Sequence, residues 1–295
     1  MTHIGRPGPA LLRAAALALG ATLILPLATP AASGADGQVP PGSPWRFPVG
    51  ERSEYEVYVG LGSVRAPRPL GEASLSVEAI EEVRGTPAYR VAMEIAGGIP
   101  FAYKMDDRQV SWVAPNPIRS LRFAETLREG DYRRDRIYRL DQERQVYSRH
   151  DRTDDGEYAV EPSESEVSMP AAALDEVSFL YFTRTLPLEV GETYRFHRFF
   201  EADGNPVELE VLRRESVRVP AGSFETVVVR PVIQASGIFA EEGRAEVYIS
   251  DDERGLIVQI KSRMRLGEIN MYLTDYDPGC SEGLIGSERA AEDCR

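Results

Sequence analysis

The chain has 295 residues, with 47 acidic and 34 basic side chains and a formal net charge of −13. This charge argues against non-specific binding to nucleic acid or to an anionic membrane surface, because both carry the same sign. With two cysteines and three histidines, the sequence also offers few side chains for thiol or zinc chemistry.

The N-terminus has the three parts of a secretory signal peptide, which we place at residues 1–35. A basic region with Arg6 and Arg13 precedes an apolar run at residues 14–28, and small residues at 33–35 form a cleavage site. The apolar run of about 15 residues is shorter than the roughly 20 that a membrane-spanning helix needs. We therefore expect cleavage, a mature charge of −15 without those two arginines, no transmembrane segment, and export to the periplasm, with secretion as the alternative.

The mature chain is long enough for one large β domain or two small ones. Residues 36–48 are rich in Gly and Pro, and we expect an extended leader with Trp45 and Phe47 as anchors on the domain. We predict a β-rich domain over residues 49–278 and a tail over residues 279–295.

Short segments with alternating apolar and polar residues begin at residue 54, a pattern typical of an antiparallel β protein. Segments 71–80 and 88–97 are expected to form a hairpin across a turn at residues 84–86. The other strands predicted in this half are residues 54–60, 101–113, 120–128, 131–140 and 145–150. An acidic, loop-like stretch follows at residues 151–168.

One helix interrupts the β pattern, and we predict it over residues 174–186. Asp175 can cap the free backbone N–H groups of its first turn, and Pro187 ends it. Its side chains are apolar nearly all round, so we expect the sheet to bury it.

The second half of the chain again shows the β pattern. Segments 192–202 and 206–220 flank a hairpin turn at residues 203–205, and another turn lies at residues 220–223. The remaining predicted strands are residues 226–234, 245–250, 256–266 and 268–277. About twelve strands with one helix predict a mainly β fold, an antiparallel, highly curved sheet or open β-barrel wrapped on one buried helix.

Two motifs carry a resemblance to a known family. The helix motif reads Asp175-x-x-Ser178-x-x-Tyr181-x-x-Arg184, followed by Leu186-Pro187-Leu188 and Gly191. The strand–turn–strand motif reads Val219-Pro220-Ala221-Gly222-Ser223-Phe224-Glu225-Thr226. Together they resemble domain-of-unknown-function family 3108 (DUF3108), a group of exported bacterial β-rich proteins, over roughly residues 48–277. The resemblance implies the fold and the compartment; the family has no agreed biochemical role.

The predicted helix carries a row of hydroxyl groups, because Ser178, Tyr181 and Thr185 fall on one face. Buried hydroxyls must find hydrogen-bond partners or line a wet cavity. Arg184, at the end of this helix, is placed to reach a strand carboxylate or a bound anion. Two interpretations follow: these groups tie the helix to the sheet, or Ser178, Tyr181 and Arg184 form a ligand-binding strip.

Cys280 and Cys294 are the only cysteines. In an oxidising compartment we expect them to form a disulfide that closes a 15-residue loop. In the chain-entropy model such a loop contributes roughly 3 kcal/mol.

We expect no metal site, no cofactor and no catalytic centre, hence no enzyme. Residues 151–156 imitate the first half of a calcium loop, but Pro162 stands where a bidentate Glu is needed. No Gly-x-Ser-x-Gly motif is present, and no nucleophile has a recognisable His base. His150 precedes the acidic loop and could form an ion pair with Asp151 or Asp154, and His197 is expected to be a structural residue in the middle of a strand.

The leading functional hypothesis is therefore a non-catalytic periplasmic or cell-envelope protein that binds an apolar or amphipathic ligand, such as a lipid or another envelope component. The alternative is a structural or interaction protein that docks onto an envelope complex and holds no internal ligand. The two differ in whether the space between helix and sheet is hollow or filled. An enzyme is a third hypothesis, favoured only if His197, Tyr181 and a carboxylate converge in a cleft.

Overall fold

The structure is a computed structural model of the chain, and it describes residues 44–61, 64–65, 68–99, 103–153, 156–232, 245–264, 267–280 and 285. The predicted signal peptide lies outside these residues, so its cleavage stays a prediction.

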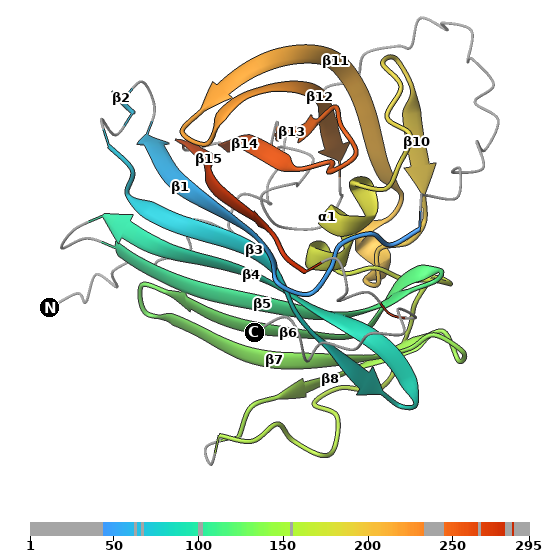
Figure 1. Cartoon of the computed structure of the whole chain (residues 1–295). Coiled ribbons are helices and arrows are strands. Elements are labelled where there is room, and N and C mark those ends of the chain that lie inside the picture. The colour runs from blue at the N-terminus through green and yellow to red at the C-terminus, as the bar shows by residue number, and fades with distance from the viewer. Residues whose placement is uncertain are drawn as a thin grey trace, which may run out of the picture.

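The described chain is mainly β-structure with one α-helix (Figure 1). The strands before the helix are β1 (Glu51–Leu61), β2 (Val64–Arg65), β3 (Gly71–Val83), β4 (Thr86–Ile99), β5 (Tyr103–Pro115), β6 (Ile118–Glu129), β7 (Tyr132–Asp141), β8 (Val146–Asp151) and β9 (Val167–Ser168). The helix is α1 (Glu176–Thr183), and a 3-10 turn, η1, covers Ala202–Gly204. The strands after the helix are β10 (Thr193–Phe196), β11 (Val207–Val219), β12 (Gly222–Val232), β13 (Glu246–Ser250), β14 (Ile257–Met264) and β15 (Gly267–Pro278).

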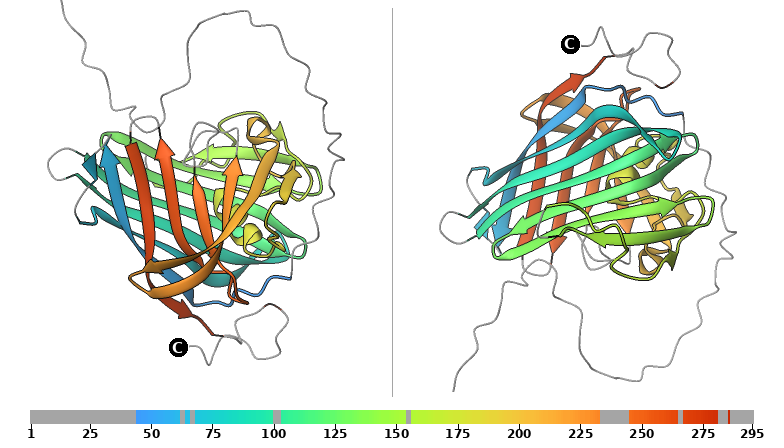
Figure 2. Two further views of the ribbon diagram at one scale, coloured as in Figure 1. Left: turned by 90° about the horizontal axis from the view of Figure 1, so that it is seen from above. Right: turned by 90° about the horizontal axis from the view of Figure 1, so that it is seen from below.

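All fifteen strands belong to one antiparallel sheet, in the order β10-β11-β12-β13-β14-β15-β1-β3-β4-β5-β6-β7-β8-β9, with β2 paired to β1. The first long strand, β1, pairs with the last strand, β15, and this pairing joins the two halves of the chain. The sheet is not closed, because its path ends at β10 on one side and at β9 on the other. Figures 1 and 2 show that it is strongly curved and that α1 lies on its concave side.

Most predicted strands are present close to their predicted bounds, because the alternation of residues matches the two faces of the sheet. In β1, Ser53 and Tyr55 are buried, whereas Glu54 between them is exposed. The predicted β3–β4 hairpin is confirmed. Its turn holds Arg84 and Gly85, both with positive φ (49° and 79°), as the tight turns that suit a twisted hairpin require.

The helix is shorter than the predicted span of residues 174–186. It begins at Glu176 after the predicted N-cap, because the Asp175 carboxylate accepts hydrogen bonds from the backbone N–H groups of Val177 (3.0 Å) and Ser178 (2.9 Å). It ends at Thr183, three residues before the predicted end. The chain then tightens into a turn in which the backbone N–H of Thr185 donates to the carbonyl of Phe182 (2.9 Å).

The predicted strand 192–202 also ends early. β10 stops at Phe196, and Phe199 and Phe200 then enter the core, where they are 2% and 1% exposed. Burial of both rings needs the chain to leave the sheet, since neighbouring residues in a strand face opposite sides. The pairing of β10 with β11 confirms the predicted hairpin, but a longer connection containing η1 replaces the tight turn at residues 203–205.

A contiguous cluster of buried side chains lies on the inner side of the curved sheet. Residues 177–183 of α1 are all buried. The leader adds Trp45 and Phe47, which are 8% and 2% exposed, in line with the predicted anchoring. The Trp45 ring stacks between Tyr89 (centroids 4.7 Å apart) and Tyr181 (5.3 Å). The leader therefore packs as part of the core.

Candidate functional site

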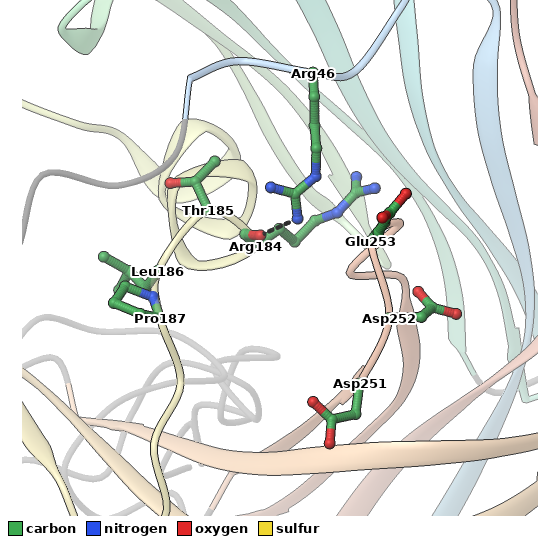
Figure 3. A pocket seen from close by; sticks show the side chains of 8 residues that line it. All are labelled: Arg46, Arg184, Thr185, Leu186, Pro187, Asp251, Asp252 and Glu253. Atoms are coloured by element: carbon green, nitrogen blue, oxygen red, sulfur yellow. Dashed lines mark hydrogen bonds between the residues drawn. The ribbon is translucent and has the colours of Figure 1, made fainter.

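A surface depression of about 550 Å³ lies beyond the C-terminal end of α1. Figure 3 shows Thr185, Leu186 and Pro187 on one side of it and the turn Asp251–Glu253 between β13 and β14 on the other. The side chains of Arg46, from the leader, and Arg184 lie where the two sides meet. The depression therefore joins three segments that are far apart in the sequence.

Arg184 already has a full set of partners. Its guanidinium donates two hydrogen bonds to the Glu51 carboxylate, Nη2 to Oε1 at 2.6 Å and Nη1 to Oε2 at 3.3 Å, and the two side chains are 2% and 4% exposed. Its Nε donates to the carbonyl of Gly255 (2.8 Å). Burial lowers the pKa of Arg184, but the charge of Glu51, the hydrogen bonds to it and the nearby Tyr181 and Tyr55 together outweigh that effect and raise the pKa overall. The side chain borders the depression as part of a closed ion pair.

Arg46 is the cation that this part of the structure leaves without a carboxylate. Its Nη2 donates to the backbone carbonyl of Arg184 (2.8 Å), and its Nε is buried with no hydrogen-bond partner. None of the described carboxylates forms an ion pair with it. Burial, and then the positive charge of Arg184, lower the pKa of Arg46. An unpaired cation at the rim of a depression favours the binding of an anionic group.

The acidic turn opposite Arg46 is only partly paired. Asp251 forms an ion pair with Arg214 (2.7 Å), and Asp252 with Arg254 (2.6 Å). Glu253 is exposed and has no hydrogen bond or ion pair to any described residue. The depression thus carries one unpaired cation and one unpaired carboxylate on facing segments.

The three residues of the predicted ligand strip, Ser178, Tyr181 and Arg184, do not lie at one site. Only Arg184 borders the depression. The Ser178 hydroxyl lies 2.7 Å from that of Ser120 on β6 and receives the N–H of Asp175 (2.9 Å). Tyr181 is 1% exposed and packs against Trp45. These contacts tie α1 to the sheet and to the leader, as the structural interpretation of the helix expects.

The structure describes His150, His197 and most of the acidic loop. His150 is buried, and its ring nitrogens contact the Ser148 hydroxyl and the Ala159 carbonyl (both 2.9 Å) instead of Asp151; Asp154 lies outside the described residues. His197 is exposed and lies beyond the end of β10, so its predicted mid-strand position is wrong. Within the described ranges, no three His, Cys, Asp or Glu side chains come together in a way that could hold a metal ion.

A second depression, of about 280 Å³, lies at the end of β5 and the β6–β7 turn. Its cations have internal partners: Arg128 binds both carboxylate oxygens of Asp135 (2.6 and 2.8 Å), and Arg133 donates to the carbonyl of Gly130 (2.7 Å). It offers a ligand less unpaired charge than the depression at Arg46.

A buried acidic group lies at the other end of α1. Glu176 has a buried carboxylate oxygen, Oε2, without a hydrogen-bond partner. Burial, and then the charges of Glu125 and Asp175, raise the pKa of Glu176 well above its ordinary value of 4.5. Glu125 is buried on β6 and accepts a hydrogen bond from Arg134 (3.4 Å). The folded chain therefore holds a proton on Glu176 at pH values where an exposed Glu is ionised.

Replacing Glu176 by Gln is expected to stabilise the fold at neutral pH and to flatten its pH dependence. Because the pKa is raised on folding, the unfolded chain releases a proton that the folded chain keeps, and stability falls as the pH rises from 4.5 through the raised pKa. Gln cannot ionise, so the gain over the wild type should grow across this window to about 1–3 kcal/mol. Urea denaturation between about pH 4 and pH 8 measures it. With the exposed Glu161→Gln as control, a gain that does not change with pH would contradict the raised pKa.

The predicted disulfide falls partly outside the described chain. Cys280 follows the last residue pair of the sheet, and its backbone N–H donates to the carbonyl of Val49 (3.1 Å). Cys294 lies outside the described residues, so the pairing stays a prediction.

No helix in the described ranges combines the length and the apolar character needed to cross a membrane. No curated protein matches the sequence. Solved structures that match this chain at low identity include three proteins. One is a β-barrel-like protein of the domain of unknown function DUF1849 from Brucella abortus, at 8% identity and a TM-score of 0.49, covering 80% of this chain and 99% of that one.

The other two come from Bacteroides fragilis and Parabacteroides distasonis. A protein described as exported, with a YmcC-like fold, from Bacteroides fragilis has 13% identity and a TM-score of 0.32. A protein described as a lipoprotein, from Parabacteroides distasonis, has 11% identity and a TM-score of 0.30. Each alignment covers 79% of this chain and 99% of the other.

The family comparison agrees with the resemblance carried by the helix motif and the strand–turn–strand motif. The sequence matches the family described as "Protein of unknown function (DUF3108)" over residues 54–274, which include both motifs. The match covers most of the chain, and the protein belongs to the DUF3108 family.

Proposed function

We propose that the protein is a non-catalytic cell-envelope protein that binds the polar end of an amphipathic envelope component in the depression at the end of α1. The observation that carries the proposal is the partly buried guanidinium of Arg46, whose Nε has no partner and which forms no ion pair with the described carboxylates. Leu186 and Pro187 beside it add an apolar surface for the first carbons of the ligand.

The proposal places the ligand at the surface because the interior is occupied. We take α1, together with Trp45 and Phe47, to fill the space around which the sheet curves. Close-packed interiors leave little room for an acyl chain unless side chains move out. The apolar tail of the bound component would then stay outside this protein, for example in a membrane.

The compartment rests on the sequence. A basic region, a short apolar run and a small-residue cleavage site at the N-terminus support export to the periplasm. An amphipathic component of the envelope is available to a protein in that compartment.

A second candidate function is docking onto another envelope protein with no small ligand. The filled interior favours it, and so does the exposed stretch at residues 160–168, in which Val160 is 82% exposed. An exposed apolar side chain within an acidic segment fits a partner with basic and apolar groups.

The test is native mass spectrometry of the protein purified from its own envelope, followed by lipid extraction. We expect a stoichiometric amphiphile with the wild type and about a tenfold lower yield with Arg46→Gln, because a charged hydrogen bond is lost. Arg52→Gln is the matched control, since Arg52 pairs with Glu54 on the surface. A wild-type protein free of amphiphile that cross-links to one envelope protein would replace this proposal with the docking function.

A further inference from the structure

We infer that the ligand of this depression is zwitterionic, the head group of a phospholipid that joins a phosphate to a primary ammonium. The inference rests on the proposed function and specifies its ligand. It follows from the two unpaired charges of the depression and from the charge of the whole protein.

The phosphate would bind at Arg46. Among the described residues its guanidinium forms a hydrogen bond only to the carbonyl of Arg184 (2.8 Å), and its buried Nε has no partner there. Guanidinium groups bind phosphate oxygens through several N–H donors at once. The second guanidinium nearby, that of Arg184, is held by Glu51 and keeps its own partner.

The ammonium would bind at Glu253. The other two acids of the turn are engaged, Asp251 with Arg214 and Asp252 with Arg254. Asp252 also accepts hydrogen bonds from the Ser250 hydroxyl (2.8 Å) and the backbone N–H of Arg254 (3.0 Å). Glu253 remains free of described partners, and its charge acts on Arg46 although the two groups form no ion pair.

This separation is what a zwitterion needs. Two groups that paired directly would leave no charge for a ligand, whereas unpaired groups on facing segments can each take one end of a molecule whose charges are a few ångströms apart. Leu186 and Pro187 line the side of the depression that lies across from the Asp251–Glu253 turn and offer an apolar surface for the carbons of the ligand.

The charge of the protein selects against a ligand that is only anionic. The chain after residue 35 has a formal charge of −15, and acidic residues Asp251–Glu253 form one wall of the depression. Asp251 and Asp252 are compensated by Arg214 and Arg254, so within the Debye length of about 8 Å at physiological ionic strength it is the unpaired Glu253 that repels a second negative charge. A head group without net charge avoids that repulsion and still gains both contacts.

The experiment is ligand-observed proton NMR on the purified protein with three soluble probes: glycerophosphoethanolamine, glycerol 3-phosphate and ethanolamine. We expect saturation transfer to the first, and at least tenfold weaker binding of the other two, because each lacks one charged contact. Glu253→Gln and Arg46→Gln should each weaken the binding of glycerophosphoethanolamine by about tenfold. Glu253 is exposed and has no described partner, so its replacement tests the inference without a risk to folding.

Co-sedimentation with vesicles identifies the source of the head group. We expect the protein to bind vesicles of phosphatidylethanolamine mixed with phosphatidylcholine and not vesicles of phosphatidylcholine alone, whose quaternary ammonium donates no hydrogen bond. Equal binding of glycerol 3-phosphate would overturn the zwitterionic assignment and leave the proposed function intact. Binding of glycine as tight as that of glycerophosphoethanolamine, without vesicle binding, would assign the site to a soluble zwitterion instead. No binding of any probe, with no amphiphile in the purified protein, would overturn both.

Discussion

Replacing Glu51 by Gln is expected to lower the free energy of unfolding by about 3–5 kcal/mol, the largest loss that we predict for a charged residue. Glu51 and Arg184 form a bidentate pair with side chains only 4% and 2% exposed. Removal of the carboxylate leaves the guanidinium buried without its counter-charge, and this desolvation is the main source of the loss.

Urea denaturation at neutral pH measures the effect, and Glu54→Gln is the matched control. Glu54 pairs with Arg52 at 3.0 Å on the same strand, but with side chains 50% and 43% exposed, so its replacement should cost under about 1 kcal/mol. A double variant, Glu51→Leu with Arg184→Met, should recover part of the stability, since it buries no unpaired charge. Equal losses for Glu51→Gln and Glu54→Gln would contradict a buried pair.

Replacing Trp45 by Ala is expected to cost about 3–5 kcal/mol, although Trp45 precedes the first strand of the sheet. Its ring is 8% exposed and stacks on Tyr89 and Tyr181, and its Nε1–H donates to the carbonyl of Phe47 (2.7 Å). Truncation leaves a cavity beside the rings of Tyr89 and Tyr181. Because β4 and α1 hold these rings in place, the surrounding side chains cannot move in to fill the cavity.

Thermal and urea unfolding measure this loss, and the exposed Val190→Ala, at 46% exposure, is the control that should stay within about 0.5 kcal/mol. Trp45→Phe should retain more than half of the wild-type packing and lose correspondingly less stability. If Trp45→Ala were as stable as Val190→Ala, the leader would not be part of the core.

The sequence predicts the strands of this fold well for a physical reason. Most strands have one face in the core and one in water, so apolar and polar residues alternate along them with a period of two. β1 and the β3–β4 hairpin are examples. The exceptions lie where burial follows another rule. Phe199 and Phe200 are adjacent in the sequence, and both are buried. The alternating pattern before them predicts a strand that continues through both residues, whereas a strand would place them on opposite faces. Residues 174–186 are apolar in nearly every position, so periodicity could not show where the helix ends.

The site is less predictable, because its ion pairs join residues that are far apart in the sequence. Arg184 stands out on the helix motif, but Glu51, its partner, is 133 positions away and resembles the other acids of a polar strand. Arg46 and Glu253 were missed: one lies in a leader that was predicted to serve as an anchor, the other in an acidic turn. The residues next to a charged side chain in the sequence do not indicate whether it will be paired in the fold. Its partners are set by the three-dimensional arrangement.

The pairing of β1 with β15 has a consequence for when this protein can fold. Partners such as Glu51 and Pro278 can come together only after the chain has been synthesised through β15. Until then the edge of β1 that will meet β15 exposes its N–H and C=O groups, and contacts of such high sequence separation form slowly. The sheet therefore cannot join its two halves during synthesis of the earlier strands, and its last strand completes it.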